Sequence, residues 1–235
     1  MRFYKVKALF KLGIEDLFKN MNVFIYVLMP LGFALLYSNI GGGSAESLFA
    51  LCVLLNIAMV PVALMGTVIA EEKEKNTLRT LMLNDVKGAE ILFAKAIICM
   101  LFVLVNDILM YFIFGLPMSS FLVYQGITLL VGLAVIFFGA FVGLLAKNQM
   151  SAGLLSLPFM VLFMAPMFVA MFGNDLATKI SSLLPTDAMM TILTKVSENS
   201  VSLSSVGMPL TVIIAWFVLS IIFFNIAYKK VGVDN

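Results

Sequence analysis

A cluster of three glutamates and one isolated aspartate are the acidic residues that could do chemistry. Glu71, Glu72 and Glu74 directly follow a long apolar run, and Asp107 lies within another. Adjacent glutamates occur in intramembrane proteases, but that chemistry also requires an arginine four residues beyond the second glutamate and later histidines. Position 76 is asparagine and the sequence contains no histidine. We therefore exclude a protease of that kind.

Other catalytic and nucleotide-binding patterns are also missing from the sequence. There is no GxxxxGK[ST] phosphate loop, so we expect this chain not to bind ATP itself. The lack of histidine excludes His-based dyads and most zinc sites, and no Ser or Thr has a base partner at a readable spacing. The prediction is a chain with no catalytic residue, no metal site and no cofactor of its own.

The elements that position these acids are membrane-spanning helices. Hydrophobic residues make up 62% of the 235 residues and charged residues 12%, and a span needs roughly 20 apolar residues to cross about 30 Å of hydrocarbon. Runs of this length are helical, because backbone groups in lipid must be hydrogen-bonded internally. The prediction is an all-α polytopic membrane protein, a single domain over 1–235, with six spans at 21–38, 48–70, 89–114, 121–146, 152–173 and 208–228.

The distribution of Lys and Arg predicts the orientation. All but Lys179 and Lys195 of the 15 Lys and Arg residues fall at the ends, in alternate connections or, for Lys95, near the start of the third expected span, which places both termini in the cytoplasm. Residues 1–20 read as an amphipathic helix lying in the membrane interface. We expect a bacterial plasma membrane protein in contact with lipid. No basic patch with interleaved aromatics suggests nucleic acid.

The connection over residues 71–88 is the longest one predicted to be cytoplasmic. Its three glutamates follow the end of a helix, where the dipole disfavours anions by roughly a few tenths of a kcal/mol each. The Glu71–Lys75 pair, four residues apart, offsets part of that cost. Thr77 then opens a short piece with an apolar stripe at Leu78, Leu81 and Met82. A membrane protein has little reason to build such a piece unless a partner docks on it.

This connection resembles the signature of the type-2 ABC exporter permeases, in which Glu-x-Glu-x-Gly-Thr-Leu-Glu follows the second span and Gly-Lys opens the third. Glu72, Glu74, Thr77 and Leu78 match the first part, and Ala94-Lys95 stands at the second. Asn76 and Arg79 depart from the pattern. The resemblance implies a coupling helix, seated in a groove of a separate ATPase subunit, with these ATPase-coupling residues: Glu72, Glu74, Thr77, Leu78, Leu81 and Met82.

The resemblance also implies the assembly and the cargo. Two ATPase subunits, carrying ATP and Mg²⁺, would dock on two permease copies, which form a homodimer or a pair of paralogues around the pathway. The chain is similar to small permeases that export antimicrobial or amphipathic peptides. Residues 174–207, with Leu184-Pro185-Thr186 in their middle, resemble the re-entrant helical pair that caps the pathway on the outer side.

Polar residues inside the spans are candidates for the pathway or its gate. A rise of ~1.5 Å per residue places Asp107 ~27 Å along its span. It then lies near the depth of Asn56 and slightly below Gln125. A carboxylate in a span should face protein or water, so these three could line an outward cavity. An internal hydrogen-bonded pair that fixes helix packing is the other interpretation.

Two further patterns admit two interpretations each. A methionine stripe at Met160, Met164, Met167 and Met171 could line a pathway for amphipathic cargo, since methionine surfaces adapt to varied apolar ligands, or could serve ordinary packing. Gly139 and Gly143 form a Gly-x-x-x-Gly frame, which allows close helix approach within the subunit or at a dimer seam.

The alternative function is an ion- or proton-coupled carrier that works without ATP and uses Asp107 as the titrating group.

Overall fold

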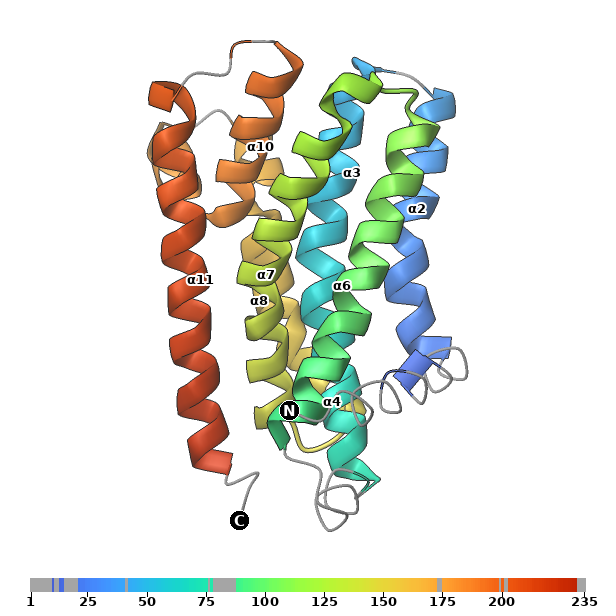
Figure 1. Ribbon diagram of the computed structural model, residues 1–235, viewed down its shortest axis with the longest axis vertical. Helices are drawn as coiled ribbons and strands as arrows, with labels where there is room; N and C mark the ends of the chain where they lie inside the picture. Colours follow the sequence, from blue (N-terminus) through green and yellow to red (C-terminus); the bar gives the residue numbers. More distant parts are fainter. Residues whose placement is uncertain are drawn as a thin grey trace.

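The computed structural model describes residues 10, 13–14, 21–40, 42–75, 77, 88–172, 175–198, 200 and 203–231, and these are helical apart from short turns, with no strand among them. Figure 1 shows the helices arranged as an elongated bundle. The elements are α2 (Met21–Ile40), α3 (Ala45–Met59), the π-helical turn η1 (Val60–Leu64), α4 (Met65–Glu74), α6 (Gly88–Ile113), the 3₁₀ turn η2 (Met118–Ser120), α7 (Phe121–Leu145), α8 (Gln149–Phe172), α9 (Asp175–Ser181), α10 (Pro185–Ser197) and α11 (Leu203–Val231).

Five helical stretches in the described residues are long and apolar enough to cross a membrane: Ala45–Glu74, Glu90–Ile113, Met118–Leu145, Gln149–Val169 and Ser205–Lys229. They confirm five of the six expected spans. The first expected span corresponds to α2, whose described apolar stretch, Phe24–Ile40, is shorter than these five. A crossing by α2 therefore stays a prediction, although α2 packs beside α3 and α6.

The two ends of the bundle differ in character. The ends of α4, α7 and α11 and the starts of α6 and α8 gather at one end (Figure 1), which we call the charged end because it holds Glu71–Lys75. Short helices α9 and α10 lie at the opposite end, in the region expected to hold a helical pair, and α10 packs between α3, α7 and α11. The predicted interfacial helix over 1–20, apart from residues 10 and 13–14, lies outside the described residues.

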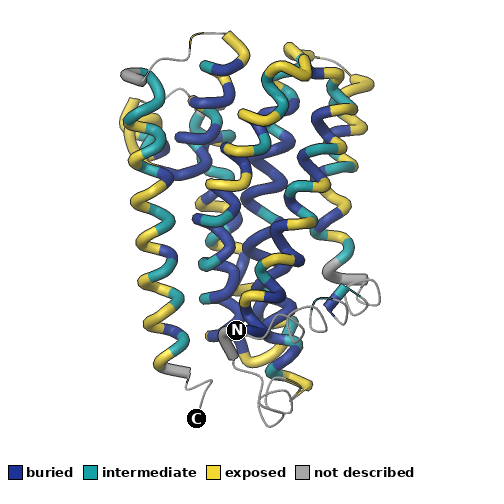
Figure 2. The backbone as a smooth tube through the Cα atoms, in the orientation of Figure 1, coloured by how far each residue is buried: buried dark blue, intermediate teal, exposed yellow. Residues whose placement is uncertain are grey.

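The core of the bundle is the continuous helix built from α3, η1 and α4. Within the described part of the chain, 83% of the residues in its 18-residue apolar stretch are buried. The same fraction is 28% for α8 and 17% for α11. Figure 2 shows the same gradient, with dark blue at the centre and yellow on α11. The central helix therefore touches protein on most sides, while α8 and α11 keep an apolar face that the other described residues leave exposed.

The Gly-x-x-x-Gly frame of α7 packs against this central helix. Pro61 has no N–H to donate, and the helix widens into η1 around it. A Cβ added to Gly139 would lie 2.3 Å from the Pro61 carbonyl oxygen, and one added to Gly143 would lie 2.8 Å from that of Gly66. The two backbones thus approach too closely for any side chain, which confirms the interpretation of the frame as packing within the subunit.

A methyl group at position 139 tests this close approach. We expect Gly139→Ala to lower the free energy of unfolding by about 1–3 kcal/mol, because the new Cβ meets rigid backbone and the helices must separate. The control is Gly126→Ala on the same helix, where an added Cβ meets nothing within 4 Å. Thermal unfolding of the purified chain in detergent would measure both, and equal melting temperatures would contradict the assigned contact.

Candidate functional site

The charges that end α4 have partners on other helices. Glu72 Oε1 lies 2.7 Å from Lys95 Nζ on α6, and the two side chains are only 10% and 8% exposed. The hydroxyl of Thr77 donates a hydrogen bond to the other carboxylate oxygen of Glu72. The ion pair therefore joins the last turn of α4 to the second turn of α6 away from bulk water.

The next two charges contact helix ends. Lys73 Nζ donates to the carbonyls of Leu144 at 2.5 Å and Ala146 at 2.7 Å, at the C-terminus of α7. A carboxylate oxygen of Glu74 accepts from the backbone N–H of Gln149, the first residue of α8, at 3.0 Å. The positive Lys73 lies at the C-terminus of α7 and the negative carboxylate of Glu74 at the N-terminus of α8, so the helix dipoles favour both charges. We call Glu72, Lys73, Glu74 and Lys95 the charge hub.

The hub explains why acids follow the end of a helix. Glu72 and Glu74 have partners on α6 and α8, and Glu71 forms the expected pair with Lys75, at 2.5 Å. Six residues were expected to contact an ATPase. The structure brings two of them, Glu72 and Thr77, into contact with each other, and the carboxylate of Glu74 contacts the start of α8. The other three, Leu78, Leu81 and Met82, lie outside the described residues.

A second polar group lies inside the spans, where α2, α3 and α6 meet. Asn56 Nδ2 donates to Asp107 Oδ1 at 2.8 Å and to the Val103 carbonyl at 3.0 Å. Asn106 Nδ2 donates to Asn56 Oδ1 at 3.1 Å and to the Val27 carbonyl of α2 at 2.8 Å. Sequence analysis grouped Asn56 with Asp107 but gave Asn106 no role, although its amide completes the network.

The network is sealed within the bundle. Asp107 and Asn56 are fully buried and Asn106 is 1% exposed. Asp107 Oδ2 has no hydrogen bond to the described residues, and the same holds for both polar side-chain atoms of Gln125 on α7. Gln125 therefore does not join the other two, and the network has the geometry of a packing device that holds α2, α3 and α6 in register.

The remaining candidates are spread over α8 and α10. Met160 is buried in the core, whereas Met164 and Met167 are half-buried against it, and the side chain of Met171 lies outside the described residues. Pro185 opens α10 and is buried. The first three methionines thus pack against the chain's own core, which is the ordinary-packing interpretation.

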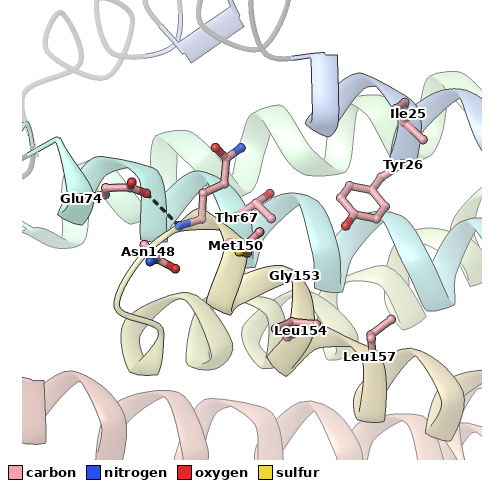
Figure 3. A pocket seen from close by; sticks show the side chains of 10 residues that line it. Ile25, Tyr26, Thr67, Glu74, Asn148, Met150, Gly153, Leu154 and Leu157 are labelled. Atoms are coloured by element: carbon pink, nitrogen blue, oxygen red, sulfur yellow. Dashed lines mark hydrogen bonds between the residues drawn. The ribbon is translucent and has the colours of Figure 1, made fainter.

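A cleft of about 700 Å³ opens between α2, α4 and α8 near the charged end (Figure 3). Its polar part contains Glu74, Asn148 and Gln149, and its apolar part contains Ile25, Leu154 and Leu157. The Nε2 atom of Gln149 is buried without a hydrogen-bond partner in the described structure. Of this lining, sequence analysis singled out Glu74 alone, because no pattern in the start of α8 marks it as a cleft wall.

Comparison with known protein families decides the class of this molecule. The chain matches the family described as ABC-2 family transporter protein over residues 13–227. It belongs to this family. No curated protein matches the chain. The family consists of membrane subunits of ABC transporters, so the chain is a multi-pass transport subunit, and the family in general works with ATPase partner subunits. Membership favours an ABC permease over the carrier that would use Asp107.

The buried ion pair of the hub should respond strongly to loss of one partner. We expect Lys95→Met to destabilise the chain by about 3–5 kcal/mol, because Glu72 would be left buried without its cation. The double variant Glu72→Gln with Lys95→Met should recover most of that loss. The control, Lys75→Met, breaks a solvent-exposed pair and should change stability by about 1 kcal/mol or less. Equal melting temperatures for the two single lysine variants in detergent would contradict a buried pair.

The Asn56–Asp107 network allows its two interpretations to be separated. Asp107→Asn keeps an acceptor for Asn56 and removes the carboxylate, so packing alone predicts full folding and full transport. Loss of transport at unchanged melting temperature would instead indicate that the carboxylate works in the pathway. Asp107→Leu is the matched variant, and it should destabilise the chain because Asn56 Nδ2 loses a buried acceptor.

Proposed function

We propose that the chain is the membrane half of an ATP-driven exporter of amphipathic molecules such as antimicrobial peptides. In this proposal two copies, identical or paralogous, enclose the pathway, and two separate ATPase subunits carrying ATP and Mg²⁺ dock at the charged end. That end would face the cytoplasm, as the Lys and Arg distribution requires, in a bacterial plasma membrane.

The observation that carries the proposal is the charge hub. Residues 75–88 connect α4 to α6, and the hub ties the end of α4 to the start of α6, the end of α7 and the start of α8. A force applied to this connection is therefore delivered to α4 and to the three spans tied to it. In the proposal, Leu78, Leu81 and Met82 bind the ATPase, Thr77 holds the connection to Glu72, and Glu72 and Glu74 pass the movement on.

The cleft between α2, α4 and α8 supports an amphipathic cargo. Its acidic and amide groups lie near the charged end, and its apolar side chains lie further along α8 and on α2. A molecule with a polar, cationic end and an apolar face could satisfy both parts at once. Pathway roles for Asn56, Asp107, Gln125, Pro185 and the methionine stripe of α8 remain part of the proposal.

Crosslinking tests the docking position. The two native cysteines, Cys52 and Cys99, are buried and should react slowly with a maleimide, so the test introduces Leu81→Cys. We expect a bifunctional maleimide to link it to a cysteine-substituted ATPase subunit in the assembled complex. Met118→Cys, exposed at the opposite end, is the control and should give no such product. Equal crosslinking of the two variants would contradict docking at the charged end.

Coupling is tested in reconstituted vesicles. We expect Leu78→Asp to abolish ATP-driven peptide uptake into inside-out vesicles while insertion stays normal, because an apolar docking contact would be replaced by a charge. Ser119→Asp places the same acid at the opposite end, on an exposed residue, and should leave uptake unchanged. Stimulation of ATP hydrolysis by cationic amphipathic peptides, but not by non-amphipathic rearrangements of their sequences, would support the cargo class; full uptake by Leu78→Asp would overturn the coupling role.

A further inference from the structure

A second, smaller groove is lined by residues that are all different from those of the first cleft. It has a volume of about 260 Å³ and is formed where α11 and α6 flank α7 in the half of the spans nearer the charged end. Its floor consists of the buried side chains Met65, Leu92, Ile136 and Ala140. None of these residues belongs to the charge hub, the Asn56–Asp107 network or the first cleft.

Aromatic rings give this groove two distinct walls. On one side, the Phe224 ring lies 5.6 Å from that of Phe137 and 5.7 Å from that of Tyr228, centroid to centroid, so these rings support one another. The other wall is formed by Phe93 of α6, whose side chain is 51% exposed. Such rings lose little conformational freedom on binding, because each has only two side-chain torsions. The groove is thus a shaped slot and not merely an exposed helix face.

The size and lining of the slot fit a flexible hydrocarbon chain. Protein interiors contain few voids larger than a water molecule, and a dry apolar cavity of about 150 Å³ is large enough to hold benzene. The slot is larger than that and offers no polar side chain at its floor. In a membrane the molecule present at high concentration beside such a slot is a phospholipid, with its acyl chains at this depth.

Polar and positive groups occur where α11 leaves the groove, with Asn225 and Tyr228 in its lining and Lys229 next along the helix. Asn225 is exposed and uses Nδ2 to donate to the Ile221 carbonyl, and Tyr228 lies one turn closer to the end of α11. Lys229 follows, is exposed, and forms no ion pair with the described residues. A lysine close to a membrane surface attracts anionic headgroups. A positive charge one residue beyond the lining residue Tyr228 therefore complements a phosphate whose acyl chain lies in the slot.

We propose that the groove between α6, α7 and α11 binds one anionic phospholipid, with an acyl chain against Phe93, Ala140 and Phe224 and its phosphate at Lys229. The site is independent of the proposed cargo cleft, since the two share no lining residue. A bound chain fills the space that separates α11 from α6 and thereby supports the most exposed span of the chain.

Tryptophan quenching by lipids with brominated acyl chains tests this site in reconstituted, full-length protein. Trp216 is the only tryptophan, so Phe93→Trp in a Trp216→Phe background reports on the groove. Phe112→Trp in the same background is the matched probe, because Phe112 is 60% exposed near the other end of α6. We expect brominated phosphatidylglycerol to bind at the groove probe about fivefold more tightly than brominated phosphatidylcholine, as one lysine near the surface predicts, and to show no preference at the matched probe.

Charge variants complete the test. Lys229→Gln should remove the preference at the groove probe, whereas Lys147→Gln, which removes an exposed lysine from the same end of the bundle, should keep it. If both probes showed the same preference for phosphatidylglycerol over phosphatidylcholine, the bound lipid would be ordinary surrounding lipid, and the proposal would be overturned. It would also be overturned if Lys229→Gln kept the preference, or if neither lipid quenched the groove probe because a second copy of the chain covers the groove.

Discussion

The arrangement of the spans at the charged end depends on one buried ion pair, Glu72 with Lys95. In a low-dielectric environment the attraction between two charges roughly balances the free energy needed to remove both from water, so such a pair adds little net stability. Its effect is on geometry, because either partner alone would be a buried, uncompensated charge. The pair thus allows only one register between the end of α4 and the start of α6, and Lys73 and Glu74 extend that constraint to α7 and α8.

This constraint determines how a displacement at the connection 75–88 would spread. The helix that ends in the hub is the most buried span, and its backbone lies directly against Gly139 and Gly143 of α7. A pull on α4 is therefore shared with α7 both at the hub and along the glycine contact. The one interruption is the π-helical turn at Val60–Leu64, where the regular hydrogen-bond ladder changes. Helix kinks occur at proline and at π-helical turns, and this turn contains Pro61, so it is where we expect α4 to move relative to α3.

Sequence reasoning located the spans well and the hub only in part. Apolar length alone sets where a helix can cross a membrane, so the boundaries of α6, α7 and α8 followed from the run of residues. The partners of Lys73 and Glu74, by contrast, are backbone carbonyls of α7 and a backbone N–H of α8, and backbone groups carry no residue signature. The same reason hid the role of Asn106, since one of its two partners is the Val27 carbonyl. Glu74 was therefore assigned a coupling role without a recognisable intramolecular partner, and that role stays a prediction.

The exposed faces of α8 and α11 need a different argument from exposed apolar faces of proteins in water. Lipid tails are as apolar as leucine side chains, so the bilayer provides no hydrophobic drive to cover such a face. Apolar exposure on these two helices is therefore compatible with lipid contact alone and does not by itself indicate a second copy. Polar groups beside those faces carry more information, because they are poorly solvated there. Such groups occur at the start of α8, where Glu74 and Gln149 meet, and at the end of α11, where Lys229 lies. They direct the search for cargo to α8 and the search for a lipid headgroup to α11.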